Sequence, residues 1–160
     1  RDLVCAPAGM GETAFLRSDE LPARAALGYV EVDGAWRTNL FHLPVRGSGD
    51  GGIYSTAADM AGFWRALFAG SIVREGTLAE MLRERSATRE DRTYGLGFWL
   101  QDGGRVVLLV GSDAGVAFRS VHDRDRLITW TLLSNTGEGV SAMTARLEQE
   151  RTAGSPSIPR

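Results

Sequence analysis

The residues that could do acid–base or nucleophilic chemistry limit what this chain can catalyse alone. All 18 basic residues are arginines, so a serine activated by a neighbouring lysine amine cannot be assembled from this chain. A Ser-His-Asp triad needs a histidine within hydrogen-bond reach of both partners, and only His42 and His122 exist. His122 alternates with Phe118 and Ser120 near the end of a predicted strand, where a lone histidine is more often structural than catalytic. His42 lies in a loop, and we interpret it in the same way.

Other catalytic patterns are weak or missing. No G-x-S-x-G segment occurs, which excludes the nucleophile turn of an α/β-hydrolase. The glycine-rich residues 47–52 precede a predicted helix but lack the lysine of a P-loop, which disfavours a phosphate site. Several carboxylates fall in predicted loops or at helix starts, where they usually cap or are solvated. They are Asp50, Asp59, Asp113 and Glu138.

The composition is that of one ordinary globular domain. The 160 residues are 43% hydrophobic and 24% charged, which is enough for a core without a disulfide or metal. The net charge is -2 and the basic residues are scattered, so we expect no nucleic-acid partner. Cys5 is the single cysteine and no paired Cys/His spacing occurs, so we expect no zinc site.

The sequence also contains no apolar run long enough to span a membrane. It starts at Arg1 without a signal sequence, which fits a fragment or a processed product. The compartment therefore stays open, since a bacterial cytoplasmic protein and an exported one are both compatible with the sequence.

Two helices are predicted in the first half of the chain. Thr56 followed three residues later by Asp59 resembles a capping box, with Asp in place of the usual Glu. Apolar residues then recur at helical spacing until Gly70 ends the run. They are Met60, Phe63, Trp64, Leu67 and Phe68. A second helix is predicted to start near Thr77.

The remaining pattern predicts strands and a last helix. Residues 27–32 read as a strand that closes in an Asp-Gly turn, which predicts a hairpin. Four further strands are predicted over residues 94–100, 106–110, 117–122 and 127–133. A helix is predicted over residues 138–151, with its inner stripe formed by Val140, Met143, Thr144 and Leu147.

This order predicts an α+β fold, in which an antiparallel sheet of about four strands carries a C-terminal helix. Residues 1–91 are expected to form part of a helical and irregular region that precedes the sheet. Residues 92–151 are expected to form the strands and final helix. Residues 152–160 mix Ser, Pro, Gly and Ala, and we expect a disordered tail.

Several short segments carry recognisable signatures in a fixed linear order. Residues 51–60 (GGIYSTAADM) are very similar to G-G-L-x-S-T-A-x-D-M. Residues 7–15 (PAGMGETAF) resemble P-L-G-M-x-D-T-x-F, and residues 24–29 (RAALGY) resemble A-x-G-Y. Residues 94–98 (YGLGF) resemble Y-G-L-G-W/F, and residues 132–135 (LLSN) resemble V-x-L-x-N. Together they resemble serine hydrolases of the class C β-lactamase and penicillin-binding protein family over nearly the whole chain.

The resemblance implies half of a β-lactamase/transpeptidase-like fold. It also implies a reactive serine and its lysine in an S-x-x-K motif, with a tyrosine in a Y-x-N motif. Neither motif occurs in this sequence, and both are expected to precede Arg1. We therefore expect a C-terminal part of a serine hydrolase that has no catalytic residue of its own and no turnover alone.

The third family motif, K-[ST]-G or H-x-G, matches residues 111–120 (GSDAGVAFRS). Ser112 takes the place of the basic residue, and Ala114 takes the place of the glycine. The resemblance implies that Ser112, Asp113, Ala114 and Gly115 form a substrate-binding strand, with the N–H of Gly115 as an oxyanion-hole donor. Without this basic residue a carboxylate-bearing β-lactam is a less favoured substrate, and an ester or amide is compatible with the site. A solvated strand end is the competing interpretation of Ser112 and Asp113.

Two other functions stay open. A family relative that has lost catalysis could bind peptidoglycan-like or other peptides, or serve in assembly. A fragment with an unpaired sheet edge could associate with itself. The expected partner of the intact protein is a small-molecule or peptide substrate, which the fold alone does not identify.

Overall fold

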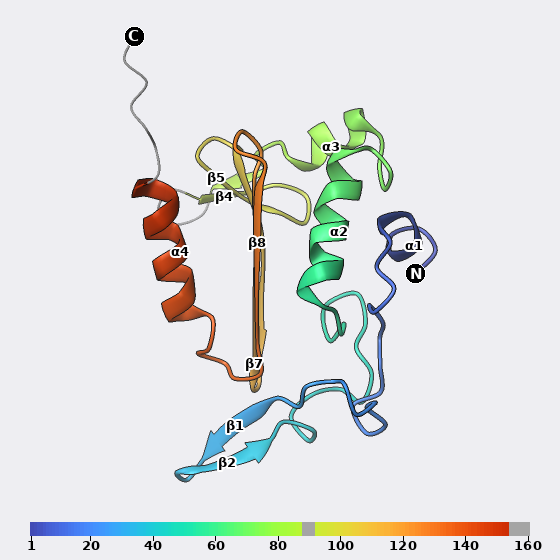
Figure 1. Cartoon of the computed structure of the whole chain (residues 1–160), viewed down its shortest axis with the longest axis vertical. Helices are drawn as coiled ribbons and strands as arrows, with labels where there is room; N and C mark the ends of the chain where they lie inside the picture. Colours follow the sequence, from blue (N-terminus) through green and yellow to red (C-terminus); the bar gives the residue numbers. More distant parts are fainter. Residues whose placement is uncertain (88–91, 154–160) are drawn as a thin grey trace.

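The computed structural model describes residues 1–87 and 92–153. Its helices are α1 (Cys5–Ala8), α2 (Ala57–Phe68), α3 (Glu75–Met81) and α4 (Ser141–Ala153). Its strands are β1 (Tyr29–Val32), β2 (Ala35–Thr38), β3 (Ser86–Ala87), β4 (Arg92–Tyr94), β5 (Trp99–Gln101), β6 (Val106–Asp113), β7 (Val116–Asp123) and β8 (Ile128–Ser134). In Figure 1, α2 and α4 flank the larger sheet on opposite sides, and the β1–β2 hairpin lies beyond one end of it. The predicted α+β fold class is confirmed.

The larger sheet is antiparallel, with strand order β3-β4-β5-β6-β7-β8. The three long strands β6, β7 and β8 confirm the predictions over residues 106–110, 117–122 and 127–133. Val106, Val107 and Leu108 are 0% exposed, because α2 and its neighbours cover one face of the sheet and α4 lies over the other. This double coverage explains why their strand reads as a continuous apolar run.

The prediction of one strand over residues 94–100 is wrong, because the chain turns in the middle of this segment and forms β4 and β5. The N–H of Gly95 donates to the carbonyl of Phe98 over 2.9 Å, and the N–H of Leu96 donates to the carbonyl of Met81 over 2.8 Å. A Cβ at Gly95 would lie 2.2 Å from the Met81 oxygen, so only glycine allows this approach. The alternation of small and large residues had suggested a strand, but the contact with the end of α3 bends the chain.

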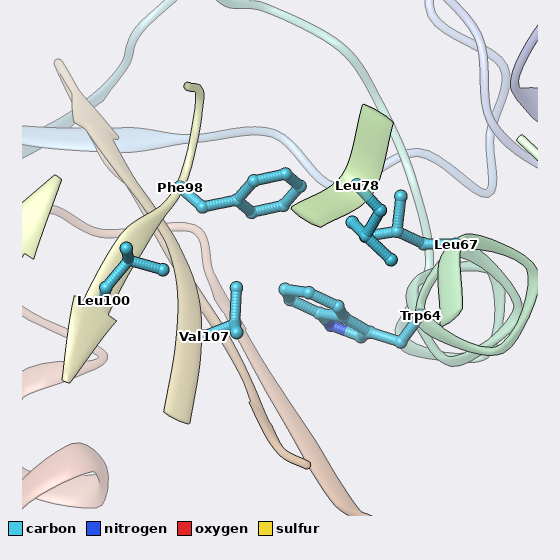
Figure 2. Packing of buried hydrophobic residues seen from close by; sticks show 6 residues of the cluster. All are labelled: Trp64, Leu67, Leu78, Phe98, Leu100 and Val107. Carbon is cyan, nitrogen blue, oxygen red and sulfur yellow. The ribbon is translucent and has the colours of Figure 1, made fainter. Parts of the chain in front are cut away.

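One hydrophobic core joins α2, α3 and the sheet. Its buried members, shown in Figure 2, are Trp64, Leu67, Leu78, Phe98, Leu100 and Val107. Trp64 is 1% exposed and reaches from α2 across to Val107 and Phe98. The apolar face predicted for the helix after Thr56 is therefore confirmed, and this face holds α2 against the sheet.

One of the two hydrogen bonds of the predicted capping box forms at the start of α2. The Oγ1 of Thr56 accepts the N–H of Asp59 over 3.1 Å, as in a capping box. The Asp59 carboxylate does not complete the box. It accepts the N–H of Glu12 over 2.9 Å and the hydroxyl of Thr13 over 2.6 Å. Asp59 thus bonds to the distant residues Glu12 and Thr13 in place of the backbone at the start of its own helix, which the sequence pattern had suggested.

The predicted inner stripe of the last helix is wrong in part. Met143 is 56% exposed, and Val140 precedes the first residue of α4. Charged side chains bind the helix to the sheet instead. Arg151 contacts Glu148 on the same helix and Asp102 beside β5, with both N–O distances at 2.9 Å. A pattern based on hydrophobic residues does not detect such an attachment.

The predicted boundary at residues 91–92, between the helical region and the sheet region, stays a prediction. Strand β3 pairs with β4 and therefore belongs to the larger sheet, although it precedes the boundary expected at residue 92. Helix α4 continues to Ala153, and residues 154–160 of the expected disordered tail lie outside the described residues.

Candidate functional site

The hairpin turn between β6 and β7 brings together the four residues predicted to form the substrate-binding strand. Asp113 pairs with Val116, so Ala114 and Gly115 are the two turn residues between the strands. Ser112 and Asp113 are exposed, Ala114 is half-buried and Gly115 is buried. The strand predicted to carry these residues therefore ends in a turn at this place, and Gly115 adopts a positive φ of 70°.

The Asp113 side chain stabilises this turn. Its Oδ1 accepts the N–H of Ala114 over 2.7 Å. This bond runs to the next residue in the chain and is therefore local to the turn. It fits the interpretation of Asp113 as a strand-end residue.

Strand β1 covers the turn, backbone against backbone. The N–H of Tyr29 lies 2.9 Å from the carbonyl oxygen of Asn135 and 3.3 Å from that of Gly115, and donates to both. A Cβ at Gly115 would lie 2.8 Å from backbone atoms of Tyr29. A Cβ at Gly28 would lie 2.6 Å from the Gly115 oxygen. The two glycines therefore permit a contact between segments that are distant in the sequence.

Asn39 is a residue of this site that sequence reasoning missed. It is 4% exposed, and its Nδ2 donates to the carbonyl of Ala114 over 2.9 Å. Its own N–H donates to the carbonyl of Gly28 over 2.9 Å. The bond to Ala114 spans 75 positions in the sequence. No pattern around a single asparagine after a predicted hairpin indicates so distant a partner.

His122 is a hydrogen-bonded structural residue, as its place in the strand predicts. Its Nδ1 lies 2.7 Å from Thr129 Oγ1, and its ring stacks on Phe68 with centroids 4.6 Å apart. Burial lowers the pKa of His122, Arg124 lowers this pKa further, and Asp123 opposes the shift. A neutral, stacked imidazole fits a packing role. His42 is exposed in its loop.

The network around Asp59 joins two of the segments that carry the family signatures. Thr13 is 6% exposed and Asp59 is 7% exposed, and Thr13 Oγ1 lies 2.8 Å from Ser55 Oγ. Asp59 accepts from the N–H of Glu12 and the hydroxyl of Thr13, so residues 7–15 are fastened to the start of α2. This network gives Asp59 an anchoring role between the two segments.

A hollow of about 450 Å³ opens in the N-terminal region, and none of the predicted site residues lines it. Its lining residues are Arg1, Cys5, Thr13, Ala14, Phe15, Arg46, Gly47 and Ile53. Within residues 1–87 and 92–153, no group of His, Cys, Asp and Glu side chains is arranged to hold a metal ion. No helix in this part of the chain is both long enough and apolar enough to cross a membrane.

Comparison with known proteins adds the following similarities. The family model Beta-lactamase matches residues 1–154. The fold is similar to a penicillin binding protein from Bacillus halodurans, with 34% identity, a TM-score of 0.88, and coverage of 93% of this chain and 48% of that one. It is also similar to D-amino acid amidase from Ochrobactrum anthropi SV3 complexed with L-phenylalanine amide, with 25% identity, a TM-score of 0.73, and coverage of 97% and 50%.

An octameric penicillin-binding protein homologue from Pyrococcus abyssi shares the fold at 21% identity, with a TM-score of 0.76 and coverage of 93% of this chain and 36% of that one. The chain thus spans half or less of the length of these three structures. No curated protein matches it.

Proposed function

The chain belongs to the Beta-lactamase family, and on this premise we propose that it is the C-terminal part of a serine hydrolase that acts by acyl transfer. One observation carries the proposal: the family match covers residues 1–154 of a chain that contains no lysine. The similar solved structures are about twice as long, which leaves room for a segment with the S-x-x-K and Y-x-N motifs.

The proposed reaction has two steps. A serine hydroxyl on polypeptide outside this chain attacks the carbonyl carbon of an ester, amide or β-lactam. The lysine and tyrosine take the hydroxyl proton and pass it to the leaving group, and an acyl-serine ester forms. Water then attacks this ester, which releases the acid and restores the serine. The chain alone, lacking the nucleophile and its base, does not turn over.

The role proposed for this chain is to stabilise the oxyanion with the β6–β7 turn. The N–H of Gly115 donates to the carbonyl oxygen while it carries negative charge, and Ser112, Asp113 and Ala114 shape the adjacent wall. Loss of one oxyanion-hole donor typically lowers the rate by about 10²–10³. No metal or organic cofactor takes part in this scheme.

The substrate class that we favour is an ester or amide. Ser112 stands where the family has a lysine or histidine, so a cation that would hold an anionic substrate group is missing there. The similarity to an amidase complexed with L-phenylalanine amide also supports an amide.

A fluorophosphonate probe, which reacts with activated serines, tests the proposal. The isolated chain is expected to stay unlabelled, and a longer protein that joins it to an intact S-x-x-K segment is expected to be labelled stoichiometrically. Replacing the serine of that motif by alanine should abolish the label. Stoichiometric labelling of the isolated chain, or no labelling of the longer protein, would overturn the proposal.

A non-catalytic peptide-binding or assembly module is the second candidate. Ser112 and Ala114 depart from the third family motif, and Gly115 is buried beneath Tyr29. Both observations favour a site that has lost catalysis. The coding sequence upstream of Arg1 separates the two candidates, since degenerate S-x-x-K and Y-x-N motifs would support the binding module.

Self-association is a further proposal, and it rests on strand β8. This strand is last in the sheet order, and its residues Ile128–Ser134 (ITWTLLS) carry no charge. Long, uncharged edge strands readily pair with another chain. We therefore expect the isolated chain to form assemblies in which a second copy adds to this edge.

A further inference from the structure

We propose that Asn39 is a positioning residue that orients the N–H of Gly115. Its side chain holds the carbonyl of Ala114, which belongs to the same peptide unit as that N–H. The inference rests on the proposed function, in which the Gly115 N–H stabilises the oxyanion.

The geometry of the peptide unit carries the first step. A trans peptide is planar, so its C=O and its N–H point in opposite directions. The Nδ2 of Asn39 donates to the Ala114 oxygen over 2.9 Å. This bond sets the plane that contains the Gly115 nitrogen, and the Gly115 N–H therefore points away from Asn39. Rotation of this peptide would break the bond and redirect the donor.

Asn39 is itself held in place, which is the second step. The side chain is 4% exposed, and its backbone N–H donates to the carbonyl of Gly28 over 2.9 Å. A Cβ at Gly28 would lie 2.3 Å from Asn39 Nδ2, so glycine leaves the space that this side chain occupies. Because the Asn39 side chain is restrained in this way, its bond to Ala114 fixes the turn relative to the segment that contains Gly28 and Asn39.

The next carbonyl of the turn is held from the same segment. The N–H of Tyr29 donates to the Gly115 oxygen over 3.3 Å. The segment that contains Gly28, Tyr29 and Asn39 therefore holds two consecutive carbonyls of the turn, one on each side of the Gly115 nitrogen. A turn with Gly at positive φ would otherwise be free to flip, and these contacts select one orientation.

The bond to Asn39 also affects the strength of the donor. Hydrogen bonds in a chain polarise one another, and each bond is strengthened by about 10–30%. A carbonyl that accepts a hydrogen bond makes the N–H of the same peptide a better donor. Asn39 thus orients and polarises the Gly115 N–H without touching substrate.

The test compares Asn39→Asp and Asn39→Ala in the longer protein that carries the nucleophile. Misplacing an oxyanion donor affects the transition state, so kcat is expected to fall about 10–100-fold while KM changes little. In Asn39→Asp the protonated acid can still donate to Ala114. Its activity relative to the unchanged protein should therefore recover as the pH is lowered, whereas that of Asn39→Ala should not. An equal pH profile for the two variants contradicts the positioning role.

The matched control is Arg124→Ala. One guanidinium nitrogen of Arg124 donates to the carbonyl of Gly104 over 3.1 Å, which is also a side-chain bond to a carbonyl of a hairpin turn. This turn joins β5 and β6 and lies at the other end of β7 from Gly115, so the variant leaves the Ala114–Gly115 peptide and the contacts of Tyr29 in place. Its kcat and KM are expected to stay within about twofold, which separates positioning from general loosening.

Amide hydrogen exchange in the 160-residue chain tests the positioning independently of turnover. Asn39→Asp and Asn39→Ala are expected to speed exchange at residues 114–116, and Arg124→Ala is not. Unchanged exchange in the Asn39 variants overturns the inference. A longer protein that is neither labelled nor active overturns the proposed function alone. An active protein whose Asn39 variants keep full kcat overturns the inference alone.

Discussion

Among single residues, the buried polar side chains on the α2 side of the sheet are the most informative. Ser120 is 0% exposed, and its Oγ accepts the indole N–H of Trp64 over 2.7 Å. The same oxygen lies 2.7 Å from Thr131 Oγ1. The hydroxyl of Ser120 is therefore buried, and both of its neighbours engage it in hydrogen bonds.

Trp64→Phe is expected to lower the free energy of unfolding by about 1–3 kcal/mol. The change leaves Ser120 without its indole donor and leaves a small void in the core. Urea denaturation monitored by circular dichroism measures the effect. Trp36→Phe, at a site that is 61% exposed, serves as control and should change stability by less than about 0.5 kcal/mol. Equal effects of the two substitutions would contradict the assigned role of the buried hydrogen bond.

The stability of the fold is expected to fall in mild acid because of His122. Burial lowers its pKa below 6.5, so the unfolded chain binds a proton more readily than the folded one. The contribution is fully present above pH 6.5 and is lost as the pH falls through 6.5 towards the lower folded pKa. Urea unfolding at a series of pH values across this window should show the decrease.

His122→Asn keeps a polar group near Thr129 but cannot titrate, and it should flatten this pH dependence. His42→Asn, at the exposed histidine, should leave the dependence in place. A slope that survives in the His122 variant and disappears in the His42 variant would show that the assignment is wrong.

Among the elements, the hairpin turns of the sheet differ in what surrounds them. Gly103 and Gly115 have almost the same φ, 65° and 70°. A Cβ at Gly103 would meet no atom within 4 Å, whereas a Cβ at Gly115 would lie 2.8 Å from the Tyr29 backbone. Comparing alanine at the two positions therefore separates the cost of the dihedral angle from the cost of crowding.

Gly103→Ala is expected to destabilise the fold by about 1–2 kcal/mol, the cost of a left-handed conformation for a residue with a Cβ. Gly115→Ala should cost about 1–3 kcal/mol more, because β1 must move away from the turn. Chemical denaturation of both variants measures the difference. If the two costs are equal, the contact between β1 and the β6–β7 turn contributes nothing to stability.

At the scale of the whole molecule, ion pairs and an open sheet edge stand out. Arg151 of α4 lies 2.9 Å from Asp102 beside β5, and Glu148 of α4 lies 3.6 Å from Arg119 on β7. Leu133 on β8 is 48% exposed, although it belongs to an apolar strand. Among residues 1–87 and 92–153, β8 pairs with β7 and is last in the strand order of the sheet. An exposed leucine on such an edge strand favours association with another chain.

Leu133→Lys is expected to weaken the proposed self-association, because a charge on an edge strand disfavours the addition of a second strand. Sedimentation velocity at several concentrations should show assemblies for the unchanged chain and a larger monomer fraction for the variant. Leu127→Lys, at a turn residue that is 79% exposed outside β8, is the control and should leave the assemblies intact. A chain that stays monomeric at all concentrations would remove the basis for the proposal.

The amino-acid sequence by itself determined the family resemblance, the α+β class, α2 and the three long strands. Each of these follows from patterns within a few residues, such as the Thr56 cap, the apolar spacing up to Phe68, and the run at residues 106–110. Such patterns are readable because hydrophobic periodicity and capping act over one or two turns of chain. The absence of lysine also follows from the sequence alone, because composition does not depend on folding.

Only the tertiary structure decided how distant segments meet. Three contacts join separate segments of the chain. They are the bond from Asn39 to Ala114, the bond from Leu96 to Met81 at the turn within residues 94–100, and the salt bridge from Arg151 to Asp102. A side-chain amide or a glycine looks the same in the sequence whether its partner is water or a backbone carbonyl. Its role is set by packing that brings the partner within hydrogen-bond distance, and no local pattern records that packing.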